Sequence, residues 1–223
     1  MQGHEFVLAG AELVARATGA LWWPAERCLV VSDLHFGKAA RLARRNGALL
    51  PPYDTSSTLA RLDAEIAALD PAEVICLGDS FDDLEAADLP DAESLWLTRL
   101  MAGRHWVWIA GNHDPGPVAL GGSHRDDVAR GPIRFCHIAK AGTEAGEISG
   151  HYHPKARLGG VSRPCFLLDA RRAILPAFGT YTGGLSASDP VLAALMLPNA
   201  LAVLTGARAL AMPMPRLREG RTS

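Results

Sequence analysis

Carboxylate, imidazole and amide side chains follow several strand-like apolar runs of this sequence. The run LVVSDLH ends with Asp33 and His35, and the run VICLGD ends with Asp79. The run WVWIA is followed by GNHD, which contributes Asn112 and His113. Carboxylates that converge repel one another unless a cation neutralises them, and neutral imidazoles are common metal ligands. We therefore expect these run ends to build a metal site.

Two later runs add histidines to this set. The run RFCHIA contains His137, and EISGHYHP contains His151 and His153. Oxygen and nitrogen donors without a thiolate suit Mn²⁺, Fe or Zn²⁺ better than Ca²⁺ or a cluster. The candidate ligands exceed what one tetrahedral ion needs, so we expect two divalent metal ions. His124 is the alternative to His137, but it stands in the polar segment GGSHRDD rather than in an apolar run.

Strands and helices are predicted to alternate along the part of the chain that carries these residues. Short strands within residues 5–23 come first, and continuous apolar runs then predict buried strands at 27–33, 73–79 and 105–114. Helical patterns occupy residues 37–47, 54–71 and 91–103. The middle helix is the clearest, because its apolar residues share one face and Asp54 to Ser57 offer N-caps. Later strands are expected at 133–139, 146–151, 163–169 and 172–179, with a short helix at 190–196.

This order of elements predicts an α/β fold with an antiparallel portion. In such sheets functional groups gather at the carboxyl ends of the strands, which is where the candidate ligands stand. A length of 223 residues suits one domain, so residues 1–223 are interpreted as a single domain. The Pro- and Arg-rich tail after Pro213 is expected to fray.

Composition and charge exclude several classes of protein. Hydrophobic residues make up 48% and charged residues 21%, which excludes a disordered chain. The 22 Lys and Arg nearly balance the 24 Asp and Glu, so a nucleic-acid partner would need a local basic patch. No run reaches the roughly 20 apolar residues of a membrane span, and no signal-peptide pattern opens the chain. The four cysteines lie in apolar runs without a CxxC pair, so we expect buried thiols and a cytoplasmic protein without membrane contact.

In this order, DLH, GD, GNHD, an isolated His and GHYH resemble the calcineurin-like metallophosphoesterase superfamily. The resemblance implies an α/β sandwich of two mixed β-sheets that pack face to face and are flanked by helices. It also implies a ligand set: Asp33, His35 and His153 for the first metal, Asp79 as the bridging carboxylate, and Asn112, His137 and His151 for the second metal.

The implied chemistry is hydrolysis of a phosphate ester. Two ions roughly 3.5–4 Å apart can hold a hydroxide between them and bind the phosphoryl oxygens as charge builds. The resemblance makes His113 the group that stabilises the transition state and protonates the leaving alkoxide. Asp114 would orient His113.

The overall pattern is most similar to one branch, the ligase-associated DNA damage response endonucleases, which are PdeM-type phosphodiesterases. The segments GHYHPKARL, PCFLLD and LPAFGTYTGGLSASDP carry this resemblance along with the metal motifs. It implies a Mn²⁺-dependent DNA phosphodiesterase that works beside a DNA ligase and a helicase. The oligomeric state stays open.

A short basic segment follows the first metal motif. Lys38, Arg41, Arg44 and Arg45 stand at helical spacing, and two interpretations of them remain open. They could contact phosphates of DNA beside the metals, or form a solvated helix face.

Two other functions share these motifs. A UDP-2,3-diacylglucosamine-type pyrophosphohydrolase would need an acyl-chain pocket and membrane contact, and the sequence offers no long amphipathic Arg/Lys-Leu segment for them. A non-catalytic protein-binding module on the same fold would lose its catalytic histidines, whereas His113 is present here.

Overall fold

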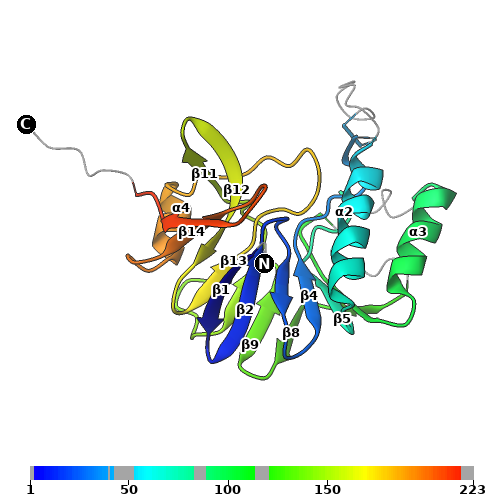
Figure 1. Ribbon diagram of the computed structural model, residues 1–223, viewed down its shortest axis with the longest axis horizontal. Coiled ribbons are helices and arrows are strands. Elements are labelled where there is room, and N and C mark those ends of the chain that lie inside the picture. The colour runs from blue at the N-terminus through cyan, green and yellow to red at the C-terminus, as the bar shows by residue number, and fades with distance from the viewer. Residues whose placement is uncertain (1–2, 40, 43–52, 83–88, 114–120, 217–223) are drawn as a thin grey trace, which may run out of the picture.

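The computed structural model describes residues 3–39, 41–42, 53–82, 89–113 and 121–216. Within them, two mixed β-sheets lie face to face and helices cover their outer faces (Figure 1). The predicted α/β sandwich is therefore confirmed. Among the described residues, no helix combines the length and the apolar composition that a membrane span requires.

The first sheet follows chain order and joins an antiparallel half to a parallel half. Strands β1 to β4 pair antiparallel, and strands β4 to β7 pair parallel. The carboxyl ends of β4, β5 and β6 therefore meet at one edge. The strands are β1 (Gly3–Leu8), β2 (Ala11–Arg16), β3 (Leu21–Trp23), β4 (Cys28–Val31), β5 (Glu73–Cys76), β6 (His105–Ile109) and β7 (Ser123–Arg125).

The second sheet has a parallel centre and antiparallel flanks. Strand β10 pairs parallel with both β9 and β13, and the outer strands pair antiparallel. Strand β11 (Lys155–Leu158) pairs with β12 alone. The other strands are β8 (Asp127–Arg130), β9 (Ile133–Cys136), β10 (Glu147–Ser149), β12 (Val161–Leu168), β13 (Arg172–Ile174), β14 (Leu201–Leu204) and β15 (Leu210–Pro213).

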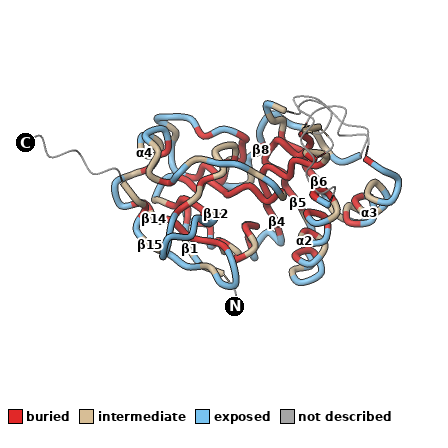
Figure 2. Tube along the Cα trace, turned by 90° about the horizontal axis from the view of Figure 1, so that it is seen from above, coloured by how far each residue is buried: buried red, intermediate tan, exposed pale blue. Residues whose placement is uncertain are grey.

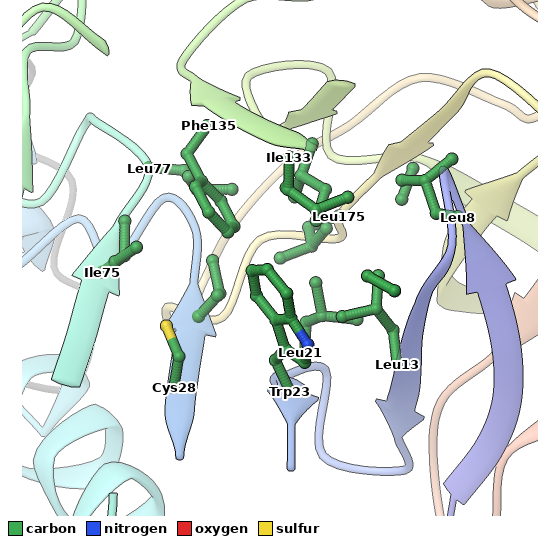
Figure 3. Packing of buried hydrophobic residues seen from close by; sticks show 14 of the residues in the cluster. Leu8, Leu13, Leu21, Trp23, Cys28, Ile75, Leu77, Ile133, Phe135 and Leu175 are labelled. Carbon is green, nitrogen blue, oxygen red and sulfur yellow. The ribbon is translucent and has the colours of Figure 1, made fainter. Parts of the chain in front are cut away.

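The main hydrophobic core lies between the two sheets (Figure 3). Leu13 and Ile75 of the first sheet and Phe135 of the second are 1% exposed or less. Burying one such side chain stabilises the fold by about 1.5–3 kcal/mol. Figure 2 shows that the buried residues concentrate in the central strands of both sheets, so the strands that end at the candidate site are fixed in place.

Helices α2 (Asp54–Leu69) and α3 (Asp91–Met101) cover the outer face of the first sheet. Leu59, Leu62 and Ile66 form the buried face of α2, as their spacing predicted, and Leu69 packs at its edge. Helix α4 (Pro190–Leu195) begins at the N-cap Asp189 and buries Leu192 against the second sheet.

The first turn of α2 differs from the prediction that its own residues would cap it. No side chain caps α2; instead Oδ2 of Asp54 accepts a hydrogen bond from the backbone N–H of Ala39 at 2.8 Å. Oγ1 of Thr55 likewise accepts one from Gly37 at 2.9 Å. These side chains hold the start of the helical turn at residues 38, 39, 41 and 42, because the chain after β4 packs onto the first turn of α2. The rest of the helix predicted at 37–47 lies outside the described residues.

Several short strands carried no sequence signal. Strands β7, β8 and β11 have exposed or polar residues on most positions, so no apolar run marks them. The fraying expected after Pro213 does not hold for the next residues. Met214 is buried, and its backbone N–H donates to the carbonyl of Ala200. The guanidinium of Arg216 donates to three backbone carbonyls near the end of α4.

Candidate metal centre

The predicted ligands meet where parallel strands of both sheets end. Asp33 and Asp79 follow β4 and β5 in the first sheet, whereas His137 follows β9 in the second. The loops after β4 and β5 pair with each other, because the backbone N–H groups of His35 and Phe36 donate to the carbonyls of Asp79 and Ser80. This pairing brings donors from distant parts of the chain to one edge of the sandwich.

The first group of donors consists of Asp33, His35 and His153, whose ligand atoms lie within 4.8 Å of one another. Nε2 of His153 lies 3.1 Å from Oδ1 of Asp33 and 3.4 Å from Nε2 of His35. Asp33 is fully buried, and His35 is 3% exposed. These residues match the set predicted for the first metal.

The second group consists of Asp79, His137 and His151, again within 4.8 Å. Nε2 of His137 lies 3.4 Å from Oδ2 of Asp79 and 3.2 Å from Nδ1 of His151. Oδ1 of Asn112 lies 3.0 Å from the same Nε2 atom, so Asn112 extends this group as predicted. The two groups are joined through the backbone N–H of His151, which donates to Oδ2 of Asp33 at 3.0 Å.

The motif glycines allow the two groups to form. A Cβ atom on Gly78 would lie 2.5 Å from Nδ1 of His137, and its φ of 80° favours glycine. A Cβ atom on Gly150 would lie 1.7 Å from Oγ of Ser32 and 2.6 Å from Oδ2 of Asp33. A larger residue at either position would push a ligand or its support away.

The backbone of the ligands is strained. Left-handed φ angles occur at Asp33 (52°), His35 (48°), Asp79 (47°), His151 (71°) and His153 (46°). Non-glycine residues adopt such angles rarely, and each costs on the order of 1–3 kcal/mol. Strain that gathers on residues of one cluster indicates that the donors are held in position for a ligand.

The chemistry of the donors fits divalent metal ions. Nδ1 of His137 lies 2.7 Å from the carbonyl oxygen of Leu77, which requires an N–H, so in the neutral ring Nε2 presents a lone pair to Oδ1 of Asn112. The buried Oδ1 atom of Asp33 accepts no hydrogen bond from the described residues. A cation bound in each group would satisfy these acceptor atoms.

The pKa shifts favour the metal-binding forms of most of these residues. Burial alone would raise the pKa of Asp79, but its contacts with His137 and the N–H of His113 lower it to about 2. Burial lowers the pKa of His35 and that of His151, which favours neutral imidazoles. The pKa of His137 is raised, because its carboxylate neighbours outweigh burial.

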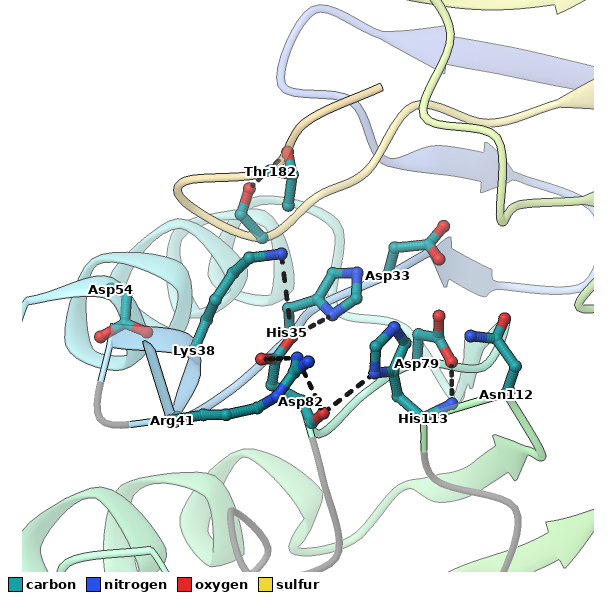
Figure 4. Close-up of polar contacts among 12 residues, drawn as sticks. Asp33, His35, Lys38, Arg41, Asp54, Asp79, Asp82, Asn112, His113 and Thr182 are labelled. Carbon is teal, nitrogen blue, oxygen red and sulfur yellow. Dashed lines mark hydrogen bonds and ion pairs between the residues drawn. The ribbon is translucent and has the colours of Figure 1, made fainter. Parts of the chain in front are cut away.

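His113 lies beside the second group. Its backbone N–H donates to Oδ1 of Asp79 at 2.8 Å, and Nδ1 of its ring lies 3.0 Å from the carbonyl oxygen of Asp82 (Figure 4). Asp114, the predicted partner of His113, lies outside the described residues. Asp82 belongs to the segment SFDD directly after Asp79, whose carboxylates the sequence predicts to order the metal ligands rather than to bind metal themselves.

The basic segment is only partly described. Nη1 of Arg41 lies 2.5 Å from Oδ2 of Asp82, and Nζ of Lys38 lies 3.7 Å from Oδ1 of the same carboxylate (Figure 4). Arg44 and Arg45 lie outside the described residues. Of the predicted substrate contacts, the structure therefore locates Lys38 and Arg41.

His124, the alternative to His137, lies apart from both groups. It belongs to β7, where it pairs with Trp108 of β6, and its ring stacks on that of Trp108 with the centroids 6.5 Å apart. His137, in contrast, stands between Asp79, Asn112 and His151. The geometry favours His137 as the ligand.

Comparisons with known proteins agree with this geometry. No curated protein matches the chain. Among solved structures, the nuclease MPE of Pseudomonas putida matches with a TM-score of 0.74 and 29% sequence identity, over 93% of this chain and 100% of that chain. The family model of the calcineurin-like phosphoesterases, which bind two divalent metal ions, matches residues 26–179. This chain therefore belongs to the calcineurin-like phosphoesterase family and is a metal-dependent hydrolase of phosphoester bonds.

Proposed function

We propose that the protein is a Mn²⁺-dependent phosphodiesterase that cleaves DNA as an endonuclease in DNA repair. The observation that carries this proposal is the pair of adjoining donor groups with His113 beside them. Asn112 is exposed and His113 is partly exposed, so a phosphodiester in an extended chain can approach this edge. The likeness to a nuclease over nearly the whole chain supports a nucleic acid as the substrate.

Each group would hold one ion. Asp33, His35 and His153 would bind the first, and Asn112, His137 and His151 the second, with Asp79 shared between them. When bound, such ions would supply Lewis acidity toward the phosphoryl oxygens and a nucleophile at neutral pH. The donors are carboxylate, imidazole and amide groups without a thiolate, which supports Mn²⁺ over softer ions.

His113 would act as the general acid. In its neutral form the contact with the carbonyl of Asp82 places a proton on Nδ1, which leaves Nε2 as the atom that gains and delivers a proton. The backbone N–H of His113 is tied to Asp79, so the ring is anchored to a proposed ligand. A proton delivered at Nε2 would stabilise the leaving alkoxide of the broken ester.

DNA would contact the basic segment beside the first group. Nζ of Lys38 is 3.7 Å from Asp82, too long for a hydrogen bond, so it can turn to a phosphate oxygen. Arg44 and Arg45 would add further phosphate contacts, which would supply a local patch on a chain of nearly balanced charge. We further propose that the enzyme acts in the cytoplasm beside a DNA ligase and a helicase.

The test is a cleavage assay with added Mn²⁺. Single-stranded, duplex and hairpin DNA are compared with a UDP-diacylglucosamine substrate, and we expect nicking of DNA without hydrolysis of the lipid. Hydrolysis of the lipid alone would replace the proposal with a pyrophosphohydrolase. No hydrolysis of either, with protein-binding activity instead, would identify a non-catalytic module.

A matched pair of histidine variants accompanies this assay. His137→Ala should lose cleavage and one bound ion, because His137 is central to the second group. His124→Ala should keep both, because His124 stacks on Trp108 outside either group. Equal losses in the two variants would contradict the proposed ligand set.

A further inference from the structure

We infer that Arg41 is a positioning residue, which acts through Asp82 on a proposed metal ligand and on the proposed acid at the same time. This inference rests on the proposed function of the site, and it changes the role expected for Arg41. Asp82 is fully buried, and it lies between His35, His113 and Arg41 (Figure 4).

The carboxylate, the main-chain carbonyl and the main-chain N–H of Asp82 all contact residues or loops of the site. Oδ1 lies 2.9 Å from Nδ1 of His35, and the main-chain carbonyl lies 3.0 Å from Nδ1 of His113. The backbone N–H of Asp82 donates to the carbonyl of Phe36 at 3.1 Å, which ties it to the loop that carries His35. One residue thus sets the position of two imidazoles.

The contact with Asp82 decides which nitrogen of His35 is available. The negative charge of Asp82, 2.9 Å from Nδ1, favours a proton on that nitrogen, so that Nε2, which lies 3.4 Å from Nε2 of His153, keeps its lone pair. A carboxylate that contacts a metal-binding histidine without binding the metal itself orients the imidazole ring and increases its basicity. Without the negative charge of Asp82, the ring could bind its proton on either nitrogen.

Arg41 balances the charge that this arrangement buries. Its Nη1 atom lies 2.5 Å from Oδ2 of Asp82 and 3.4 Å from the carbonyl oxygen of Asp82, which also contacts His113. A fully buried carboxylate without such a partner would be costly, so Asp82 depends on Arg41 for its place.

This arrangement separates Arg41 from the other basic residues. The guanidinium of Arg41 forms an ion pair with Asp82 at 2.5 Å, whereas Nζ of Lys38 lies 3.7 Å from the same carboxylate. A substitution of Arg41 should therefore act through His35 and His113. It should not act as the loss of a contact to a DNA phosphate.

The experiment compares Arg41→Gln, Arg41→Lys and Asp82→Asn with the control Arg208→Gln, whose side chain is exposed. Mn²⁺ binding is measured by calorimetry without substrate. We expect Arg41→Gln and Asp82→Asn to lower the Mn²⁺ affinity of one of the two sites by about 10–100-fold, the usual loss when a residue that supports a metal ligand is removed. Arg41→Lys should recover part of this loss, and Arg208→Gln should match the wild type.

Kinetics then separate a positioning role from contact with DNA. Arg41→Gln should lower kcat on DNA and on a small aryl phosphodiester, with the larger loss on DNA because its alkoxide needs the proton of His113. The salt dependence of DNA binding should stay unchanged. Intact Mn²⁺ binding with a higher KM for DNA and a flatter salt dependence would overturn the inference. If the wild type hydrolyses the aryl ester but not DNA, the proposed function fails while the Mn²⁺ result still tests the inference. If Arg41→Gln does not fold, Asp82→Asn and Arg41→Lys decide, and unchanged Mn²⁺ affinity in both would overturn it.

Discussion

The two donor groups differ in what holds their central histidine. In the first group, Nδ1 of His35 faces the side chain of Asp82, which in turn depends on Arg41. In the second group, Nδ1 of His137 faces the main-chain carbonyl of Leu77, directly after β5. One support is an ion pair between side chains, and the other is the backbone of a buried sheet.

This difference indicates that the groups respond to different kinds of substitution. A side-chain change can remove the support of His35, because Asp82 and Arg41 supply it. No side-chain change can remove the carbonyl of Leu77, so only a steric change near the backbone can displace His137. The metal content of variants can therefore separate the groups.

The largest effect is expected for Asp79→Asn. Asp79 is the carboxylate that the proposed ligand set shares, and its pKa of about 2 keeps it charged at neutral pH. An amide carries no negative charge, so both ions should bind poorly and cleavage should fall to background. Elemental analysis after Mn²⁺ loading should approach two ions per chain in the wild type and none in the variant. Asp127→Asn, which removes an exposed ion pair with Arg134, should keep both ions.

A selective loss is expected for Gly78→Ala. The new Cβ would lie 2.5 Å from Nδ1 of His137, where it blocks the contact with Leu77. We expect one ion per chain to be lost and the other to remain. Gly103→Ala is the matched control, because Gly103 also has a left-handed φ of 74° but open space around its Cβ position. Both variants should lose about 1–2 kcal/mol of stability from backbone strain, and only Gly78→Ala should lose metal. Retention of both ions would show that the second group tolerates displacement.

The meeting of these donor residues at one edge of the sandwich could largely be predicted from the sequence. Asp33, Asp79 and Asn112 end apolar runs that became adjacent parallel strands, so one topological rule brought them together. His137 and His151 follow parallel strands of the second sheet, and here the order of motifs identified them. The fold class and the family followed from the same motifs.

The supports of the ligands could not be predicted in the same way. The partner of His137 is a carbonyl, which every residue has, so no side-chain pattern marks Leu77. The pairing of Arg41 with Asp82 depends on how two loops pack, and spacing within one helix made Arg41 resemble a solvated or DNA-facing residue. Asp54 was predicted to cap its own helix, but its carboxylate accepts a hydrogen bond from Ala39, which belongs to another segment.

His113→Ala should change the rate without changing either group. Its backbone N–H, which the variant keeps, makes the bond to Asp79, so two ions should still bind. Cleavage of esters with poor leaving groups should fall by about 10²–10⁴-fold, the usual contribution of general acid catalysis. Activated aryl esters should lose less, because a phenolate leaves without a proton. Equal losses on the two substrates would count against an acid role.

The smallest effect concerns the thiols, which report on the backbone that supports the second group. Cys136 is 5% exposed and precedes His137, and Cys165 on β12 is fully buried. Burial raises the pKa of Cys165 from 9.0 to about 12, so at pH 8 this thiol is protonated in the folded protein and reacts slowly.

We expect both thiols to label slowly in the native enzyme and quickly after denaturation, as followed by mass spectrometry of peptides. Asp82→Asn should leave both rates unchanged, because it alters only the side-chain support of His35. Gly78→Ala should speed up the labelling of Cys136 and leave Cys165 slow, because the displaced His137 is the next residue after Cys136. Faster labelling of Cys136 in Asp82→Asn would mean that the two supports are coupled, and the contrast between a side-chain and a backbone support would then fail.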